Sequence, residues 1–312
     1  MRVVVVHPNP DTARELLAVL SAELPDADMA IWSPDYAHQA DYAAGWLPSA
    51  EFFAQQHSLR GFFSAWAGVE RILASSTLPM TLPIIRLEDA GMGAHMSDYC
   101  VTAVMQWVRR RDEYEQQQRE RIWRQLPPHD LAEWPVGLFG FGVLGRRVAA
   151  AFDVLGFPVH GYARTAPADA PFPCYAETGG AGDFGAFLRA TRVLILLAPL
   201  TPQTQDRFNR ETLAQLPRGA YVVNVARGGL LVDEALLELL DNDHLAGAAL
   251  DVFRQEPLPP EHPFWAHPKV RMTPHVAAVT LIVPSARQIA GKIRRFHAGE
   301  PVSGLVDRTR GY

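Results

Sequence analysis

Residues 136–145 read Val-Gly-Leu-Phe-Gly-Phe-Gly-Val-Leu-Gly, and this stretch decides the fold. Its first four residues form an apolar run typical of a buried strand, and the next six spell a G-x-G-x-x-G sequence that opens a helical pattern. In this context the glycines allow a tight turn, close approach of a pyrophosphate and close helix packing. We therefore predict a dinucleotide site whose phosphates meet a helix N-terminus. The residues that would line it are Gly140, Gly142, Val143, Leu144 and Gly145, and a purely structural glycine turn is the alternative.

The end of the next predicted strand bears on which dinucleotide is bound. Versions of this motif that bind NAD carry an acidic residue about twenty positions further on, which accepts hydrogen bonds from the ribose. The corresponding segment here is Gly161-Tyr162-Ala163-Arg164-Thr165 and contains no carboxylate. Arg164 and Thr165 can instead meet a 2′-phosphate through charge and hydroxyl, so we predict a preference for NADP(H), with NAD(H) possible. An exposed arginine without a role is the alternative.

Apolar runs separated by helical patterns extend in both directions from this stretch, as in α/β proteins. The later series predicts buried strands at 136–139, 158–162, 193–197, 221–225, 248–250 and 270–272, with helices at 146–155 and 233–240 among the connections. The earlier series predicts strands at 3–6, 59–65 and 82–87, and a helix that carries Leu16, Leu17, Leu20 and Leu24. This repetition predicts an α/β fold with doubly wound parallel sheets.

A long segment without glycine or proline, from Met96 to Trp123, separates the two series. It exceeds the length of a compact connector, so we predict an interdomain helix that extends into a dimer arm, with a domain boundary near residue 97. The apolar side chains on this segment that would face a second copy are Val101, Val104, Met105 and Val108. We therefore expect a homodimer.

Four polar residues follow predicted strands of the later series. Arg227 follows 221–225, Asp251 follows 248–250 with Glu256 close behind, and His275 follows 270–272. Ligands of open parallel sheets bind beyond the carboxyl ends of the strands, where the glycine loop also lies. Chain direction alone therefore places these four side chains at the cofactor edge of the sheet.

The chemistry of these four side chains fits reduction of a keto acid. Arg227 offers a planar fork that can hold a carboxylate and polarise a keto oxygen. His275 can give a proton to that oxygen as hydride reaches carbon, and Glu256 would pair with the imidazolium. Asp251 is interpreted as a group that positions the cofactor rather than as a second acid. The alternatives are a helix-end cation, a structural histidine, a surface glutamate and a strand-end cap, respectively.

Composition excludes several other classes of protein. The net charge of -5 gives no general attraction to nucleic acid or to an anionic membrane surface. Two cysteines, Cys100 and Cys174, imply no disulfide framework, and no cysteine or histidine cluster predicts a metal site. The N-terminal apolar run is too short for a signal peptide, and no later run is long enough to span a membrane. We expect a cytoplasmic protein.

Taken together, these motifs resemble those of the D-isomer-specific 2-hydroxyacid dehydrogenases. The stretches that carry the resemblance are 140–145, Ala198-Pro199-Leu200-Thr201-Pro202-Gln203-Thr204, Val225-Ala226-Arg227-Gly228, Leu250-Asp251-Val252-Phe253, Thr273-Pro274-His275 and, in the earlier series, Ala67-Gly68-Val69-Glu70. Three further stretches, 86–93, 258–261 and 306–312, are similar to a bacterial subgroup that reduces glyoxylate and hydroxypyruvate. The resemblance covers essentially the whole chain.

This resemblance implies a fold, a cofactor and a set of site residues. A flavodoxin-like substrate-binding domain would comprise 1–97 plus 286–312, and a Rossmann-type dinucleotide-binding domain 98–285, with 98–133 as the dimer arm. The catalytic set would be Arg227, Glu256 and His275, and Asp251 would contact the nicotinamide side. Further cofactor contacts would come from Pro199, Thr204 and Val225, and substrate contacts from Trp46, Ala67, Gly68 and Arg227. The subgroup carries further basic residues after the position of Arg164, whereas this chain continues Thr165-Ala166-Pro167.

Two other functions stay open from the sequence alone. A dehydrogenase for a bulkier keto acid or for phosphoglycerate would share every motif above. A dinucleotide-sensing interaction protein on the same fold would retain Arg227, Glu256 and His275 yet act by binding a partner. The chain has no long disordered tail or basic patch of the kind such a partner-binding protein would use.

Overall fold

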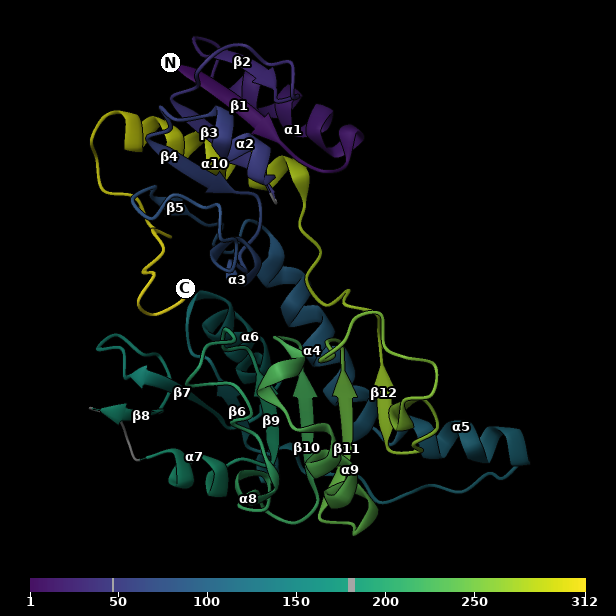
Figure 1. The fold of residues 1–312 in the computed structure, drawn as a ribbon. Coiled ribbons are helices and arrows are strands. Elements are labelled where there is room, and N and C mark those ends of the chain that lie inside the picture. The colour runs from purple at the N-terminus through teal and green to yellow at the C-terminus, as the bar shows by residue number, and fades with distance from the viewer. Residues whose placement is uncertain (47, 179–182) are drawn as a thin grey trace. The chain divides into compact units, whose positions relative to one another are not determined.

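The computed structural model describes residues 1–46, 48–178 and 183–312 (Figure 1). The chain divides into two compact units: Met1–Met92 together with Thr280–Tyr312, and Gly93–Val279. The predicted boundaries at 97 and 286 fall inside helices α4 (Met92–Val108) and α10 (Ile282–His297). The helical sequence pattern continues through residues 97 and 286, and no linker-like composition marks a domain boundary at either position. The assignment of the first unit to substrate binding stays a prediction.

The first unit is built on a parallel sheet whose described strands follow the order β2-β1-β3-β4-β5. This is the flavodoxin-like order of a doubly wound sheet. Helix α10, close to the C-terminus, packs against α1 and β4, so the end of the chain returns to this unit (Figure 1). The remaining bounds are β1 Arg2–Val6, α1 Pro10–Glu23, β2 Asp28–Ile31, β3 Tyr42–Gly45, α2 Ala50–Gln55, β4 Gly61–Ser64, α3 Glu70–Leu73 and β5 Ile84–Ile85.

The second unit carries a larger parallel sheet, with described strands in the order β12-β11-β10-β9-β6-β7-β8. Counted from β6, this is the Rossmann order with one strand added beyond the sixth. The predicted fold class, two doubly wound parallel-sheet domains, is confirmed. The bounds are α5 Arg111–Glu120, β6 Val136–Phe139, α6 Val143–Val154, β7 Val159–Thr165, β8 Cys174–Thr178, α7 Phe184–Ala190, β9 Val193–Leu196, α8 Arg210–Leu213, β10 Ala220–Asn224, α9 Asp233–Asp241, β11 Leu245–Leu250 and β12 Val270–Met272.

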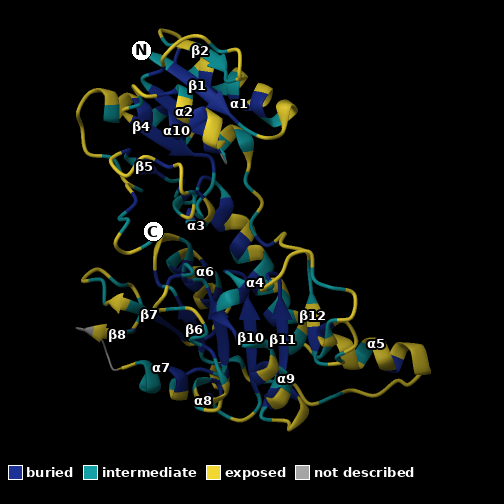
Figure 2. Ribbon diagram, in the orientation of Figure 1, coloured by how far each residue is buried: buried dark blue, intermediate teal, exposed yellow. Residues whose placement is uncertain are grey.

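The central strands of this sheet are buried on both faces, which explains their continuous apolar sequences. All four residues of β6 and of β9 are buried, as are all five of β10 (Figure 2). One apolar cluster packs α7, α8 and α9 against one face, and the other packs α4 and α6 against the opposite face. The strands are therefore rigidly held, and the loops at their carboxyl ends are fixed in place.

The prediction of one long helix from 96 to 123 is wrong in detail. The structure has two helices, α4 and α5, and Arg110 between them adopts the left-handed conformation, with φ of 55°. The core of the second unit buries Val104 and Val108, so neither is free to meet a second copy. The helix propensities of the residues did not predict the break at Arg110, because arginine favours helices.

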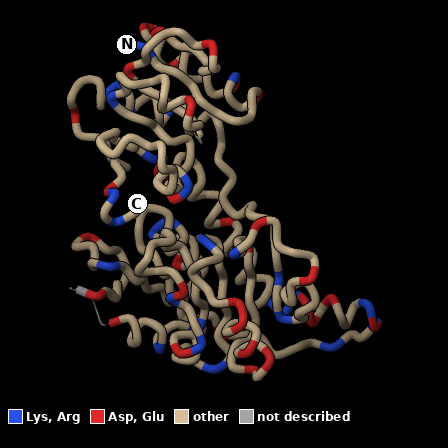
Figure 3. The backbone as a smooth tube through the Cα atoms, viewed as in Figure 1, with Lys and Arg blue, Asp and Glu red and all other residues tan. Residues whose placement is uncertain are grey.

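Basic and acidic residues are interspersed along the described chain (Figure 3). Three consecutive arginines, 109–111, lead into α5 and follow this pattern, because Arg110 pairs with Glu113 at 2.6 Å and Arg111 with Glu115 at 3.7 Å. No helix in the described part of the chain is long and apolar enough to cross a membrane.

A buried histidine on β7 makes a pH-dependent contribution to stability. The hydroxyl of Thr191 donates to the Phe187 carbonyl, so His160 Nε2 donates to Thr191 Oγ1 at 2.8 Å as a neutral ring. Burial lowers the pKa of His160 to about 4. The unfolded chain binds this proton near pH 6.5, so stability is full above that pH and falls as the pH drops towards 4.

We expect this histidine to cost about 3 kcal/mol of unfolding free energy between pH 6.5 and 4. Urea unfolding at several pH values measures the slope, and His160→Gln, which cannot titrate, serves as the comparison. Equal pH slopes for the two proteins would contradict the prediction.

Candidate active site

The glycine loop between β6 and α6 has the geometry that the motif predicts. Gly140 has φ of +110°, and a Cβ there would lie 2.5 Å from the backbone nitrogen of Ala198. A Cβ on Gly145 would lie 2.1 Å from the Gly140 carbonyl oxygen, so α6 approaches the loop more closely than any other residue allows. A Cβ on Gly142 would meet nothing within 4 Å, so this face of the loop is open to a ligand.

Helix α6 begins directly behind that open face. Gly142 is its N-cap, and Val143 and Leu144 form its first turn. The first N–H groups of a helix have no intrahelical partner and lie at the positive end of its dipole. Arg146, one turn on, forms a bidentate pair with Asp169 at 3.0 and 3.1 Å. These residues fit a pyrophosphate.

The end of β7 presents the side chains expected to contact the ribose. Tyr162 is buried and Ala163 is half-buried, whereas Arg164 and Thr165 are exposed at the carboxyl end of the strand. This is the end of the sheet at which the glycine loop also lies, because β6 and β7 pair in parallel. The arrangement leaves Arg164 and Thr165 accessible to a 2′-phosphate.

The turn after β9 uses the predicted cofactor residues Pro199 and Thr204 internally. Thr204 Oγ1 donates to the Pro199 carbonyl at 2.8 Å and accepts the backbone N–H of Thr201 at 2.8 Å. In this structure the Thr204 hydroxyl therefore closes the turn, and a part in cofactor binding stays a prediction.

Arg227 lies in the loop after β10, where the backbone is fixed by a buried asparagine. Asn224 Nδ2 donates to the Arg227 carbonyl at 3.0 Å, and Asn224 Oδ1 accepts the N–H of Ala226 at 3.2 Å. Val225, the first residue of this loop, is buried. A Cβ on Gly228 would lie 2.0 Å from the carbonyl carbon of Phe253, so the loop is pressed against the one that follows β11.

His275 and Glu256 form the pair that the sequence predicts. His275 Nδ1 lies 2.8 Å from Glu256 Oε2, and Glu256 Oε1 accepts the backbone N–H of Phe253 at 3.0 Å. Because a carboxylate only accepts, Nδ1 carries the proton, and Nε2 is the ring nitrogen that remains to exchange a proton with a ligand. The histidine side chain is 50% exposed, so a ligand can reach it.

Asp251 holds the loop that carries His275, a structural role of the kind that the strand-end-cap alternative describes. It is 1% exposed, and its Oδ1 accepts the Thr273 hydroxyl at 2.6 Å and the N–H of Val276 at 2.8 Å. Its Oδ2 accepts the N–H of Ala277 at 2.9 Å. The carboxylate is thus directed into this loop, and contact with the nicotinamide side stays a prediction.

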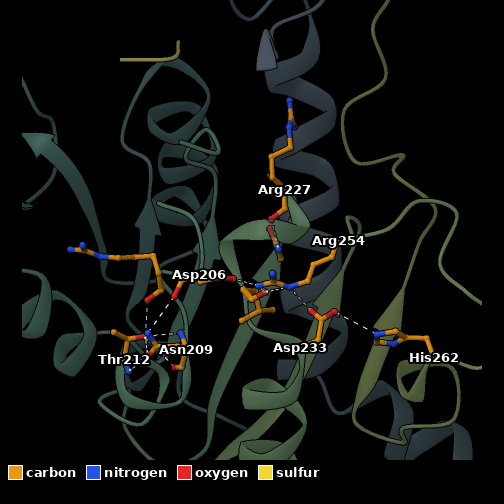
Figure 4. Close-up of polar contacts among 10 residues, drawn as sticks. Asp206, Asn209, Thr212, Arg227, Asp233, Arg254 and His262 are labelled. Atoms are coloured by element: carbon orange, nitrogen blue, oxygen red, sulfur yellow. Dashed lines mark hydrogen bonds and ion pairs between the residues drawn. The ribbon is translucent and has the colours of Figure 1, made fainter. Parts of the chain in front are cut away.

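A residue that sequence reasoning missed is Arg254, which ties three loops together (Figure 4). Its guanidinium donates to the Leu231 carbonyl and to Asp206, and lies 3.8 Å from Asp233, which in turn lies 3.5 Å from His262. Burial raises the pKa of Asp233, against the opposing effect of Arg254 and His262. In Figure 4 the Arg227 side chain points away from this group. The only feature of the sequence that pointed to Arg254 was its position two residues before Glu256.

The predicted substrate residues of the first unit follow β3 and β4. The Trp46 and Trp66 rings stack with their centroids 4.6 Å apart, and His7 stacks on Trp66 at 5.5 Å. The Ser64 hydroxyl donates to the Trp66 carbonyl at 3.0 Å and accepts its N–H at 3.2 Å, which fixes the start of the Ala67-Gly68 loop. Trp46 and this loop are thus joined through Trp66.

Metal ligation finds no support in the described segments 1–46, 48–178 and 183–312. No group of three or more His, Cys, Asp or Glu side chains there is arranged to hold an ion.

The chain matches a known family over most of its second unit. Residues 101–277 match the family model described as D-isomer specific 2-hydroxyacid dehydrogenase, NAD binding domain. Among curated relatives, glyoxylate/hydroxypyruvate reductase A of Klebsiella pneumoniae subsp. pneumoniae is 42% identical over 317 residues, with both chains covered in full. The counterpart from Serratia proteamaculans is 41% identical over the same length.

Solved structures are similar over the whole chain. A D-isomer-specific 2-hydroxyacid dehydrogenase from Xanthobacter autotrophicus, in complex with NADPH and MES, has a TM-score of 0.90 at 35% identity and covers 99% of each chain. An NADPH-dependent glyoxylate/hydroxypyruvate reductase from Sinorhizobium meliloti, in complex with NADP and sulfate, has a TM-score of 0.88 at 33% identity and covers 100% of this chain and 99% of its own.

Proposed function

The chain belongs to the D-isomer-specific 2-hydroxyacid dehydrogenases, and we propose that it reduces glyoxylate and hydroxypyruvate to the corresponding 2-hydroxy acids with NADPH. The observation that carries the proposal is the His275–Glu256 pair, whose free ring nitrogen is accessible at the carboxyl edge of the Rossmann sheet. Full-length relatives with these two substrates in their names support the choice of substrate.

His275 is the proton donor in this proposal. The reduced nicotinamide supplies the hydride when it is bound, and the open face at Gly142 with the first turn of α6 would hold its pyrophosphate. His275 gives the proton on Nε2 to the keto oxygen as charge develops there. Glu256 holds the ring by Nδ1 and stabilises the imidazolium state from which the proton leaves.

Arg227 and the first unit recognise the substrate in this proposal. The Arg227 guanidinium holds the carboxylate and polarises the neighbouring keto oxygen through parallel N–H groups. The backbone N–H groups of Ala67 and Gly68 bind the carboxylate as well, and Trp46 limits the size of the third substituent. A compact 2-oxo acid has the carboxylate, the keto oxygen and the small third substituent that these roles require.

The choice of NADPH rests on the end of β7. Arg164 and Thr165 are exposed there, and no carboxylate occupies 163–165 to repel a 2′-phosphate. The solved relatives from Xanthobacter autotrophicus and Sinorhizobium meliloti were crystallised with NADPH and NADP, which supports the same choice. NAD(H) would bind the same loop without the contribution of Arg164.

We expect kcat/KM to be higher with NADPH than with NADH. Arg164→Ala should narrow this ratio by about tenfold, the effect of losing one charge-assisted hydrogen bond. Ala163→Asp should favour NADH, since a carboxylate would repel the phosphate and accept from the ribose. Steady-state kinetics with both cofactors measures the ratio, and equal use of the two by the wild type would refute the assignment.

A panel of 2-oxo acids tests the substrate. We expect glyoxylate and hydroxypyruvate to exceed branched, aromatic and phosphorylated acids in kcat/KM with NADPH, and Trp46→Ala to reduce that difference. A preference for phenylpyruvate or phosphohydroxypyruvate would replace this proposal by the broader dehydrogenase function. Tight NADPH binding without turnover of any acid would favour the dinucleotide-sensing alternative.

We further propose that the protein is a cytoplasmic homodimer joined through the arm at 98–133. Both cysteines are buried free thiols, as suits a reducing compartment. Trp123, three residues after the end of α5, is 103% exposed, and Ile122 beside it is 45% exposed. Large apolar side chains so exposed on a projecting segment mark a contact with another chain.

Sedimentation of the wild type and of variants in the arm tests the proposed homodimer. Sedimentation at micromolar concentration should show a dimer, and Trp123→Ser with Ile122→Ser should shift it towards monomer. The same double change at Val154 and Leu155, apolar residues exposed at the C-terminal end of α6, is the matched control. A wild-type protein that is monomeric at this concentration contradicts the proposal.

A further inference from the structure

We propose that Tyr99, on helix α4, is a positioning residue for His275 and acts through Thr273 and Asp251. Neither Tyr99 nor Thr273 belongs to the set that sequence and family assign to catalysis. The Tyr99 hydroxyl lies 2.5 Å from Thr273 Oγ1, across 174 positions of sequence, and both residues belong to the second unit. The inference rests on the proposed role of His275 as proton donor.

The three side chains form a series of hydrogen bonds that all run in one direction, from Tyr99 through Thr273 to Asp251. Thr273 Oγ1 has one proton, and it donates that proton to Asp251 Oδ1 at 2.6 Å, since a carboxylate only accepts. The Thr273 oxygen is then an acceptor for Tyr99, so the tyrosine must donate. Removing the Tyr99 proton leaves Thr273 without its donor and free to turn away from Asp251. One hydroxyl on α4 thus determines how firmly the aspartate is oriented.

Asp251 transmits this orientation to the backbone of His275 and of the two residues that follow it. The His275 N–H donates to the Asp251 carbonyl at 2.8 Å, and the next two N–H groups, of Val276 and Ala277, donate to the carboxylate. His275 has φ of 57°, a left-handed conformation that a non-glycine residue keeps only where its surroundings enforce it. The hydrogen bonds to Asp251 enforce it here. If the Asp251 carboxylate is less firmly oriented, the loop that carries His275 can change its conformation. His275 Nε2 then moves away from the position in which it protonates the substrate.

The tyrosine keeps its proton throughout the working pH range. Burial raises the pKa of Tyr99 to about 12. The hydroxyl is therefore a permanent donor and not a titrating group. The chain Tyr99–Thr273–Asp251 serves to hold position and does not relay protons to the substrate.

The test removes single hydroxyl groups and measures turnover and loop stability separately. Tyr99→Phe and Thr273→Val should each lower kcat with NADPH and glyoxylate by about tenfold, the effect of one hydrogen bond, with KM for NADPH unchanged. Amide hydrogen exchange across 273–278 in the NADPH-bound enzyme should speed up by a similar factor. Thr273→Ser, which keeps the hydroxyl, should behave like the wild type. The double variant Tyr99→Phe/Thr273→Val should cost no more than Thr273→Val alone, because Tyr99 acts only through Thr273.

Tyr42→Phe is the matched control, since it removes a buried tyrosine hydroxyl bonded to His297 in the first unit. It should change neither kcat nor exchange across 273–278. A Tyr99→Phe enzyme with wild-type exchange in this segment, or with wild-type kcat, overturns the inference. Exchange needs no substrate, so faster exchange in a protein that turns over no 2-oxo acid refutes the proposed function and leaves the positioning role intact.

Discussion

Replacing His275 with asparagine is expected to lower kcat by roughly 10² to 10⁴, the usual contribution of a positioned general acid. Asparagine keeps a polar group near Glu256 but has no proton to give at the position of Nε2. The keto oxygen then becomes negative in the transition state with no general acid to protonate it. NADPH binding should survive, because the proton is needed only as the hydride moves. Steady-state kinetics and fluorescence titration with NADPH measure the two quantities.

Two further variants separate this chemistry from general damage. Glu256→Gln keeps the hydrogen-bonding shape but removes the charge that faces the imidazolium, so kcat should fall by about tenfold or more. His267→Asn alters another histidine of the same unit that lies 3.3 Å from a carboxylate, Asp241, and should leave kcat unchanged. A His275→Asn enzyme with near-normal turnover would remove His275 from the reaction.

The second sheet was predictable from the sequence because its strands are buried on both faces. Burial of this kind demands unbroken apolar runs such as 136–139 and 193–196, which stand out without knowledge of their partners. The strands that were missed lack this signature. β2 is a half-exposed strand at the edge of the first sheet and begins with Asp28. β8 is a strand at the edge of the second sheet and contains Glu177. β3 contains two alanines and a glycine. Small or polar residues at these positions give no strand signal on their own.

Chain direction alone located the main polar residues of the site. Strands β10, β11 and β12 are neighbours and parallel, so the loops that carry Arg227, Asp251 and His275 come side by side at one edge. The partners of those residues were not predictable. Tyr99 and Thr273 are 174 positions apart, and Arg254 and Asp206 are 48 apart. No spacing in a single sequence marks a contact that depends on how two loops and a helix pack.

Changing Arg227 to lysine is expected to lower kcat/KM by roughly 10² to 10³, the effect of losing one donor that stabilises developing charge. Lysine keeps the positive charge but is a single point donor, whereas the arginine fork can hold a carboxylate and a keto oxygen together. The loop is fixed through the Arg227 backbone by Asn224, so the substitution leaves the backbone in place. KM for the 2-oxo acid should rise as kcat falls, because in the proposed mechanism the side chain acts on the bound substrate as well as on the transition state.

Chemical rescue gives the sharpest test of this role. Arg227→Ala should be nearly inactive, and millimolar guanidinium ion should restore part of kcat/KM by occupying the vacated place, whereas ammonium ion should not. Arg210→Lys, a surface arginine paired with Glu238 at 2.7 Å, is the matched control and should keep full activity. If Arg227→Lys retains wild-type kcat/KM, or if ammonium restores activity as well as guanidinium does, the planar fork has no part in the reaction and Arg227 contributes charge alone.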